Sequence, residues 1–324
     1  MRRLAVVVVV LCLVTGVAHG GDLYKDAAGP HAVDEFLGAW RDPARDRVIP
    51  YKVYAPRAVA VAVAVPVVVV SHGVGGSREG LSYLGRHWAS HGYLAVHLQH
   101  AGSDEEVLRG LAGAAAMRAL QKAAADPRAA ADRPLDVRFA VDRILADGVG
   151  HGAFAYRADP GRLAVAGHSF GAFTALAAAG VTFATPRGKL NLGDPRLKAA
   201  IALSAPAMRN QTAESFATVA IPTLHMTGTD DDGVVTDTDV SERRNAYDRI
   251  TAAPRHLVVL DGADHMTFGG RTTDGAGDER HLALIRATTT AFLDAYVLHD
   301  AVAVRWLGEG LVAGDDGIAV VEHR

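Results

Sequence analysis

Short apolar runs rich in Val, Ile and Leu recur along the chain, and most are apolar at nearly every position rather than at every second one. Such a run predicts a strand that is buried on both faces, as in a parallel sheet. Seven runs fit this description: Val48–Tyr54, Pro66–Ser71, Tyr93–Gln99, Arg162–Gly167, Ala199–Ser204, Pro222–Thr227 and His256–Leu260.

Stretches long enough for helices lie between these runs. They are Glu79–His91, Pro134–Asp147, Ala172–Gly180, Glu242–Thr251 and Glu279–Leu298. Alternating strands and helices indicate βαβ units. We therefore expect an α/β protein with a doubly wound, mostly parallel sheet of about eight strands and helices on both faces. The alanine-rich segment 111–131 is expected to be a surface or packing helix, because Ala has the highest helix propensity.

The first twenty residues have the pattern of a secretory signal peptide. Arg2 and Arg3 precede an unbroken apolar run from Leu4 to Val14, and the small residue Ala18 lies two positions before Gly20. This pattern predicts cleavage near Gly20 and a secreted or periplasmic protein with no stable membrane span in the mature chain. The alternative is a membrane anchor, but the run is shorter than the about 20 residues that a spanning helix needs.

The remaining residues, 21–324, are expected to form one domain, with 301–324 as a C-terminal extension. Cys12 is the one cysteine, and the residues before it lack the small residue typical of a lipoprotein signal. Because Cys12 lies in the predicted signal peptide, the mature chain has no thiol, and any nucleophile must be another residue. An intramolecular disulfide framework and a Cys-based zinc cluster are also excluded.

The composition excludes two further classes of protein. Of the 324 residues, 49% are hydrophobic, which is enough for a core and excludes a wholly disordered chain. The formal net charge is −3, and it becomes more negative when Arg2 and Arg3 are removed. The chain has no basic excess that would bind nucleic acid.

Ser169 is the candidate nucleophile. The predicted strand Arg162–Gly167 leads into Gly-His-Ser-Phe-Gly at 167–171, followed by a small-residue helix. In this strand–turn–helix context, G-x-S-x-G forms a sharp turn that exposes the Ser oxygen, and its glycines relieve the crowding. The alternative is a Ser that only caps the helix.

A serine hydroxyl needs an adjacent base, and in this fold the order along the chain is Ser, acid, His. His265 follows an apolar strand directly, in a loop from which it could reach Ser169. The preceding strand ends at three adjacent carboxylates, Asp230, Asp231 and Asp232, among which spacing does not choose. A calcium site is the other interpretation, but the EF-hand register would place Gly228 at the first ligand, so we expect no metal.

Two backbone N–H groups are needed to bind the negative oxygen of an acyl-transfer intermediate, each worth about 3 to 4 kcal/mol. The residue after the nucleophile, Phe170, usually supplies one. The glycine-rich segment 71–76 after the third strand offers Val74 for the other. A phosphate-binding loop is the alternative, but the segment lacks the Lys-Ser/Thr ending of a P-loop and a complete dinucleotide fingerprint.

The chain resembles the secreted α/β-hydrolases related to the platelet-activating factor acetylhydrolases and the bacterial dienelactone hydrolase-like proteins. The similarity spans about Trp40 to Leu298. It rests on these segments: 45–54 (RDRVIPYKVY), 71–76 (SHGVGG), 88–93 (WASHGY), 97–104 (HLQHAGSD), 167–171 (GHSFG) and 262–265 (GADH).

The resemblance implies an α/β-hydrolase fold and ester hydrolysis without a cofactor. It implies Ser169 as nucleophile, His265 as base, and the N–H groups of Val74 and Phe170 as the oxyanion hole. Members with the acid after this strand show Gly-x-x-Asp, which selects Asp231 in the register from Gly228.

Three features depart from the family pattern. Animal acetylhydrolases carry the acid one strand earlier, where this chain has Ser204. Dienelactone hydrolases use a cysteine nucleophile, which the mature chain lacks. The substrate-stacking Trp of secreted polyester hydrolases has no counterpart here, because Trp40, Trp88 and Trp306 lie elsewhere.

Other residues near the predicted site are candidates for contact with substrate. They are His72, Gly73, His100 and His168. For His100, together with Asp104, we favour the alternative that hydrogen bonds from these residues hold their own loop. The segment Thr182–Pro195 is either a short lid or a surface loop. We expect a small-molecule, lipid or polymer ester as substrate. A serine peptidase or amidase, and a non-catalytic binding protein with this fold, are the competing functions.

Overall fold

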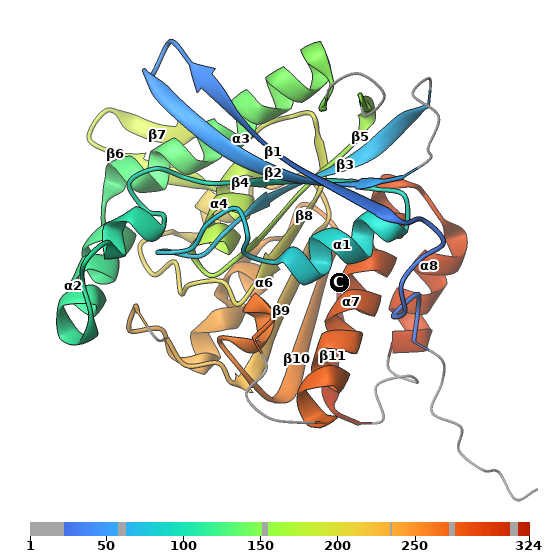
Figure 1. The fold of residues 1–324 in the computed structure, drawn as a ribbon. Coiled ribbons are helices and arrows are strands. Elements are labelled where there is room, and N and C mark those ends of the chain that lie inside the picture. The colour runs from blue at the N-terminus through green and yellow to red at the C-terminus, as the bar shows by residue number, and fades with distance from the viewer. Residues whose placement is uncertain (1–22, 58–62, 151–154, 234, 272–275, 312–316) are drawn as a thin grey trace, which may run out of the picture.

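The computed structural model describes residues 23–57, 63–150, 155–233, 235–271, 276–311 and 317–324. The predicted signal peptide lies outside these residues. A mostly parallel sheet of nine strands runs through the described part in the order β1-β2-β4-β3-β5-β8-β9-β10-β11 (Figure 1). The strands of this sheet are β1 (Val33–Asp42), β2 (Arg47–Pro56), β3 (Ala64–Ser71), β4 (Leu94–Leu98), β5 (Arg157–His168), β8 (Leu197–Leu203), β9 (Thr223–Asp230), β10 (Arg255–Asp264) and β11 (Ala319–His323).

The predicted doubly wound sheet is confirmed, and all seven apolar runs are strands of it. Strands β3, β4, β5, β8, β9 and β10 are parallel to their neighbours in this series. Antiparallel pairing is confined to the two ends of the sheet, where β1 pairs with β2, β2 with β4, and β10 with β11.

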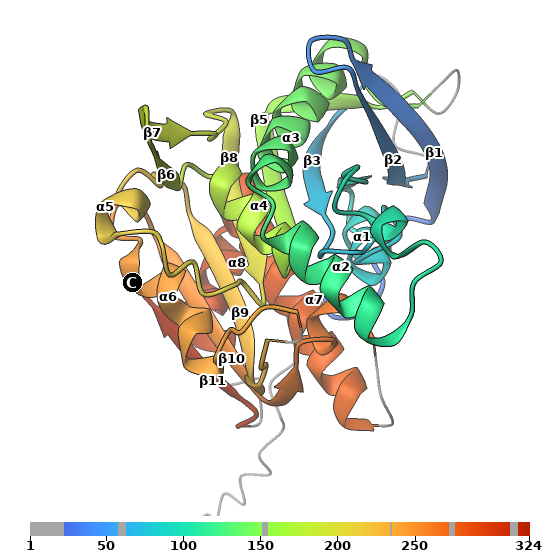
Figure 2. The same ribbon diagram turned by 90° about the vertical axis from the view of Figure 1, so that its left-hand side faces the viewer.

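Helices cover both faces of the sheet, as Figures 1 and 2 show together. The α-helices of the described residues are α1 (Ser82–Ser90), α2 (Gly113–Ala124), α3 (Pro127–Asp147), α4 (Phe170–Ala178), α5 (Ala213–Phe216), α6 (Asn245–Arg249), α7 (Ala276–Val297) and α8 (Ala301–Arg305). Residues of α3, α4 and α6 join one buried apolar cluster, and residues of α1, α7 and α8 join the other. Each face of the sheet therefore has its own core.

The apolar-run pattern did not reveal the two edge strands. Along β1 the side chains alternate between half-buried and exposed, and in β11 most are also only partly buried, so neither reads as an apolar run. The described parts of the expected extension 301–324 consist of α8, a turn of π-helix (Trp306–Gly310) and β11, which pairs with β10. The end of the chain thus completes the sheet.

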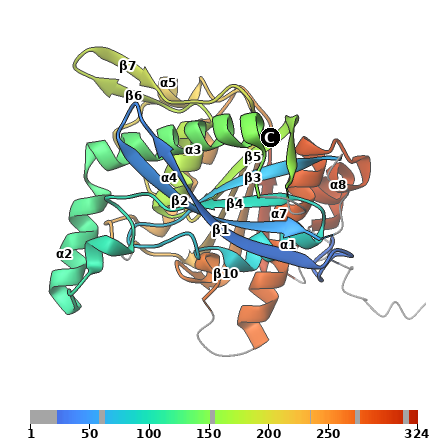
Figure 3. The same cartoon turned by 45° about the horizontal axis from the view of Figure 1, so that its top comes forward.

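Segment 182–195 forms a small hairpin, β6 (Thr182–Thr185) with β7 (Gly188–Asn191), rather than an irregular loop. Figure 3 shows it at the periphery of the molecule. All four residues of β7 are exposed. Because the hairpin pairs only with itself, it forms a second sheet that is separate from the nine strands.

Helix α3 begins seven residues before the predicted start at Pro134. Asp126 caps it by accepting a hydrogen bond of 2.9 Å from the N–H of Arg128, and Pro127 occupies the first turn. Pro at this position is favourable, because an N–H there would lack a partner within the helix. The helix continues through Pro134, so Arg133 lies inside it, on the buried face with Ala129 and Val137.

The turn between β5 and α4 is the tightest part of the fold near the predicted site. Ser169 has φ 57° and ψ −119°, a backbone conformation that residues other than glycine rarely adopt. A Cβ on Gly171 would lie 1.9 Å from the carbonyl oxygen of Ser71, and one on Gly167 would lie 2.1 Å from the carbonyl oxygen of Gly171. Only glycine allows β5, α4 and the end of β3 to approach so closely.

We predict that Gly171→Ala lowers the free energy of unfolding by about 3 kcal/mol, because the added methyl group must displace backbone. The matched control is Gly308→Ala, where a Cβ would meet no atom within 4 Å. Urea denaturation of both variants checks this. Equal unfolding midpoints for the two would contradict the close approach at the turn.

Candidate active site

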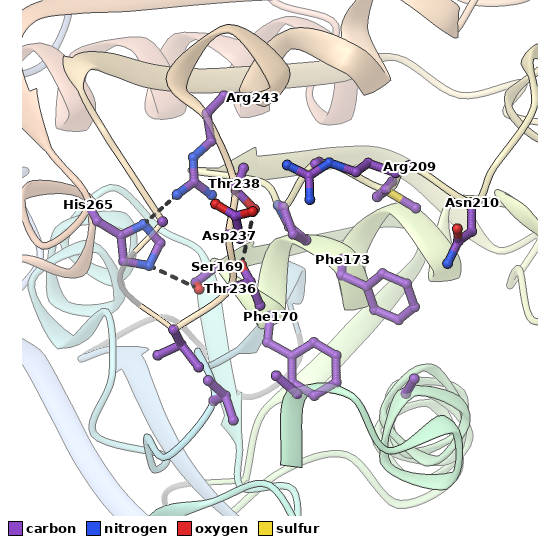
Figure 4. A pocket seen from close by; sticks show the side chains of 18 of the residues that line it. Ser169, Phe170, Phe173, Arg209, Asn210, Thr236, Asp237, Thr238, Arg243 and His265 are labelled. Carbon is purple, nitrogen blue, oxygen red and sulfur yellow. Dashed lines mark hydrogen bonds between the residues drawn. The ribbon is translucent and has the colours of Figure 1, made fainter. Parts of the chain in front are cut away.

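The turn at Ser169 brings three predicted residues into one chain of hydrogen bonds. The Nε2 atom of His265 lies 3.0 Å from the Oγ atom of Ser169 (Figure 4). Its Nδ1 atom lies 3.0 Å from Oδ1 of Asp231. Ser169 follows β5, Asp231 follows β9 and His265 follows β10. The carboxyl ends of parallel strands meet at one edge of a sheet, which is why residues so far apart in sequence meet here.

Asp231 is the one of the three adjacent carboxylates that points inward. Its side chain is fully buried, whereas Asp230 and Asp232 are exposed. The hydroxyls of Ser204 and Thr227 donate to its two oxygens, each at 2.8 Å. These two donors hold the buried carboxylate in one orientation.

Ser204 also contacts the histidine. Its Oγ atom lies 2.6 Å from Nδ1 of His265, so the Nδ1–H group is shared between this hydroxyl and Asp231. Ser204 has a positive φ of 51°, which turns its side chain toward the pair. The position where the resembled animal enzymes carry the acid therefore holds a hydroxyl that bridges the acid and the histidine in this chain.

The buried Arg243 neutralises the acid and holds its surroundings. Its Nη2 atom lies 3.1 Å from Oδ1 of Asp231, and its other nitrogens donate to the carbonyl oxygens of Ser204, Ala205 and Asp231. Burial lowers the pKa of Arg243, and the charge of Asp231 opposes this shift. The sequence did not predict a role for Arg243, because Ser-Glu-Arg-Arg at 241–244 has the composition of a solvent-exposed helix.

The expected oxyanion-hole residues flank the serine. A Cβ on Gly73 would lie 3.4 Å from the Cβ of Ser169, so the loop before Val74 touches the nucleophile. Phe170 is the first residue of α4, and its N–H therefore has no carbonyl partner within the helix. The turn that follows Val74 is closed by the N–H groups of Gly75 and Gly76, which donate to the carbonyl oxygens of Ser103 and Gly73 respectively. Val74 and Phe170 both line the cavity beside Ser169.

Below this loop lies a buried polar network that the sequence did not predict. The Nε2 atom of His100 lies 3.0 Å from Oγ of Ser71, and its Nδ1 lies 2.9 Å from Asp136. His72 accepts from the N–H of His100 at Nε2 and donates from Nδ1 to the carbonyl of Gly73 at 2.6 Å. Burial, with the nearby cation Arg133, lowers the pKa of both histidines, so they are neutral.

His72 and His100, two of the candidates for contact with substrate, lie in this network and not in the described lining of the cavity. Both side chains are buried, and both use their ring nitrogens on protein groups. Their hydrogen bonds instead hold the loop that carries Val74. His168 and Gly73 are likewise outside the described lining of the cavity.

His168 contacts His265 and its loop. Its Nε2 atom donates to the carbonyl of His265 at 2.9 Å, and the two rings lie 4.7 Å apart. Burial and the neighbouring His265 lower the pKa of His168 to about 3, so it stays neutral. The second residue of the G-x-S-x-G motif thus fixes the loop that carries His265.

Beside Ser169 lies a cavity of about 350 Å³, near the lower end of the range for small-ligand sites. Part of its wall is apolar: Val74, Ala124, Ala130, Phe170, Phe173 and Met208. The remainder includes polar side chains, among them Arg209, Asn210, Thr236 and Asp237 (Figure 4). Ala124 and Ala130 belong to the alanine-rich segment, whereas the hairpin β6–β7 contributes no described lining residue.

Within the described residues, no three His, Cys, Asp or Glu side chains are grouped so that they could hold a metal ion. Across the same residues, no helix has both the length and the apolar character needed to cross a bilayer.

The sheet topology, the strained Ser turn and the position of the site at the carboxyl ends of the strands define an α/β-hydrolase fold. Residues 157–262 match the model of the serine hydrolase (FSH1) family. The match covers about a third of the chain and includes β5, Ser169 and Asp231. A comparison with curated proteins found no match.

The many buried neutral histidines predict a loss of stability in mild acid. Their pKa values lie below that of an unfolded histidine, about 6.5, so as pH falls through this value the unfolded chain binds protons that the folded chain does not. Burial is the largest cause at each, with pKa values of about 3 to 4: His87, His97, His100, His168, His225 and His256.

We expect the urea midpoint to fall between about pH 7 and pH 5, and each such group adds up to about 1.4 kcal/mol per pH unit. His225 lies in β9 away from the cavity, and His225→Gln should make this decline shallower. His299→Gln, at an exposed position, is the control and should keep the wild-type slope. A midpoint that does not change with pH would contradict the prediction.

Proposed function

We propose that the protein is a serine hydrolase that cleaves carboxylic esters through an acyl-enzyme. The proposal is carried by one observation: the Oγ atom of Ser169, both ring nitrogens of His265 and the buried Asp231 form one chain of 3.0 Å contacts beside a cavity. This is the arrangement that activates a weak serine nucleophile. The match to a serine hydrolase family supports the proposal.

In the first half of the reaction, Oγ of Ser169 forms a bond to the ester carbonyl carbon while its proton moves to Nε2 of His265. The carbonyl electron pair moves to the oxygen, which the N–H groups of Val74 and Phe170 bind. When this oxygen reforms the double bond, the bond to the alcohol oxygen breaks. The alcohol leaves with the proton from His265, and Ser169 remains acylated.

In the second half, water attacks the acyl carbon and gives a proton to His265. The second tetrahedral intermediate collapses, the bond to Ser169 breaks, and the proton returns to Oγ as the carboxylic acid leaves. Asp231 keeps the ring in the Nδ1–H tautomer and stabilises the imidazolium in both halves. No cofactor takes part in these steps.

The same proposal includes the kinship with the platelet-activating factor acetylhydrolase and dienelactone hydrolase-like proteins, and export through the predicted signal peptide. The cavity volume favours an ester whose acyl group is small, since about 350 Å³ is enough for a modest ligand only. Its apolar wall, with the rings of Phe170 and Phe173 at 5.6 Å, suits an apolar acyl group.

Ser169→Ala is expected to lower the turnover of short-chain p-nitrophenyl esters by at least about 10⁴-fold, because the attacking oxygen is lost. The exposed Ser241→Ala is the control and should behave as wild type. A fluorophosphonate probe should label the wild type and the control but not Ser169→Ala. Ester turnover that survives in Ser169→Ala would refute the assignment.

Matched amide and ester substrates separate the proposed esterase from a peptidase or amidase, since the esterase should prefer the ester. If the fluorophosphonate probe leaves wild-type Ser169 unlabelled, the protein is instead a non-catalytic member of the fold.

Asp231→Asn is expected to lower kcat by about 10³- to 10⁴-fold. The amide would present an N–H₂ group to Nδ1 of His265 and favour the wrong tautomer. Asp230→Asn and Asp232→Asn change exposed side chains and should stay within about threefold of wild type. Steady-state kinetics of the three variants decide among the adjacent carboxylates. A larger loss in Asp230→Asn or Asp232→Asn than in Asp231→Asn would reassign the acid.

A further inference from the structure

Arg133 is a fully buried cation that the proposed reaction does not use directly. Its guanidinium donates to the hydroxyls of Ser71 and Ser103 at 3.2 and 2.9 Å and to the carbonyl of His72 at 2.7 Å. Longer contacts of 3.4 Å reach the carbonyl of Gly73 and the hydroxyl of Thr174. Each of these acceptors is neutral.

In the described part of the chain, no carboxylate lies within ion-pair distance of Arg133. The nearby Asp136 is bound by Arg45, Arg47 and His100. Burial is the main reason that the pKa of Arg133 falls to about 9, which still leaves it charged at neutral pH. The charges of Asp136 and Asp104 oppose this lowering of the pKa only from a distance. A buried charge without a direct ion pair costs free energy, so its retention calls for an explanation beyond packing.

The position of this charge suggests the explanation. The carbonyl of Gly73 belongs to the same peptide group as the N–H of Val74. It accepts from Arg133 and also from Nδ1–H of His72 at 2.6 Å. A peptide whose carbonyl accepts a hydrogen bond and lies beside a cation is polarised, and its N–H becomes a better donor. Arg133 therefore holds and strengthens one of the two proposed oxyanion donors.

The same guanidinium also lies against the residue that supplies the other donor. Its central carbon is 4.3 Å from the centre of the Phe170 ring, and it contacts Thr174 one turn further along α4. The ring separates the cation from the cavity, which Phe170 lines. The positive charge is thus shielded from water and lies against both segments that carry the proposed N–H donors.

We propose that Arg133 is a positioning residue for the oxyanion hole, and that its unpaired charge finds its counter-charge in the negative oxygen of the tetrahedral intermediate. The neutral ester offers no such charge. The interaction therefore strengthens on going to the transition state, which raises kcat rather than substrate affinity. This inference rests on the proposed esterase function.

Two substitutions separate the charge from the hydrogen bonds. Arg133→Gln keeps N–H donors for the loop carbonyls but removes the charge, whereas Arg133→Lys keeps the charge but not the planar fork. The matched control is Arg138→Gln on the same helix, since Arg138 donates to the carbonyl of Gly193 away from the cavity. Thermal melting first establishes that each variant is folded.

For Arg133→Gln we expect kcat to fall about 10- to 100-fold with KM within about threefold of wild type. Arg133→Lys should lose less, and Arg138→Gln should match wild type. The affinity for an alkyl trifluoromethyl ketone, which adds to Ser169 as a hemiketal, should fall in proportion to kcat/KM. In a ¹⁹F NMR titration, the hemiketal pKa should be higher in Arg133→Gln than in wild type and change less in Arg133→Lys.

A kcat within about threefold of wild type in folded Arg133→Gln would overturn the inference. So would equal losses in Arg133→Gln and Arg133→Lys with an unchanged hemiketal pKa, because that result indicates only a structural role. If Arg133→Gln does not fold, Arg133→Met, which also removes the charge and keeps a long side chain, replaces it: wild-type kcat and ketone affinity in folded Arg133→Met would overturn the inference. Absence of Ser169-dependent turnover in wild type would instead overturn the proposed function, and this inference with it.

Discussion

The close approach of Gly171 to the carbonyl oxygen of Ser71 is the constraint on which the rest of the site depends. It brings the first turn of α4 against the end of β3, so the N–H of Phe170 and the loop of Val74 lie on the same side of Ser169. The strained backbone of Ser169 is maintained because β5 is held between β3 and β8 in the middle of the sheet. The positions of the proposed nucleophile and of its proposed anion site thus both depend on the contact between Gly171 and Ser71.

Two buried arginines then distribute positive charge around this turn in different ways. Arg243 lies against Asp231 and forms an ion pair with it, so the acid side of the site is close to neutral. Arg133 lies behind the loop of Val74 and has only neutral partners among the described residues. The first arrangement stabilises a charge that is present throughout the reaction. The second places a field where a negative charge would arise only during turnover.

The sequence predicted the interior of the sheet well and its edges poorly, for one physical reason. Strands buried on both faces must be apolar at nearly every position, and this leaves a clear signal in runs such as Pro66–Ser71. The side chains of β1 alternate between half-buried and exposed, and those of β11 are at most partly buried. Because one face of each strand meets water, neither has a continuous apolar run in the sequence. The start of α3 was also predicted too late, since Pro134 was read as a beginning although Asp126 and Pro127 form the cap.

What the sequence determined by itself was the set of candidate catalytic residues. Ser169, His265 and the Asp triplet follow three apolar strands in the order expected of this fold, and parallel strands end at one edge. The family resemblance favoured Asp231, but spacing alone did not choose among the three carboxylates. Only the tertiary structure showed that Asp231 is the buried one, because its burial and the hydroxyls of Ser204 and Thr227 depend on segments distant in sequence. It also showed that the rings of His72 and His100 are buried and bonded to protein groups. It placed Arg133 against the loop of Val74 as well, since such contacts exist only once the helices pack on the sheet.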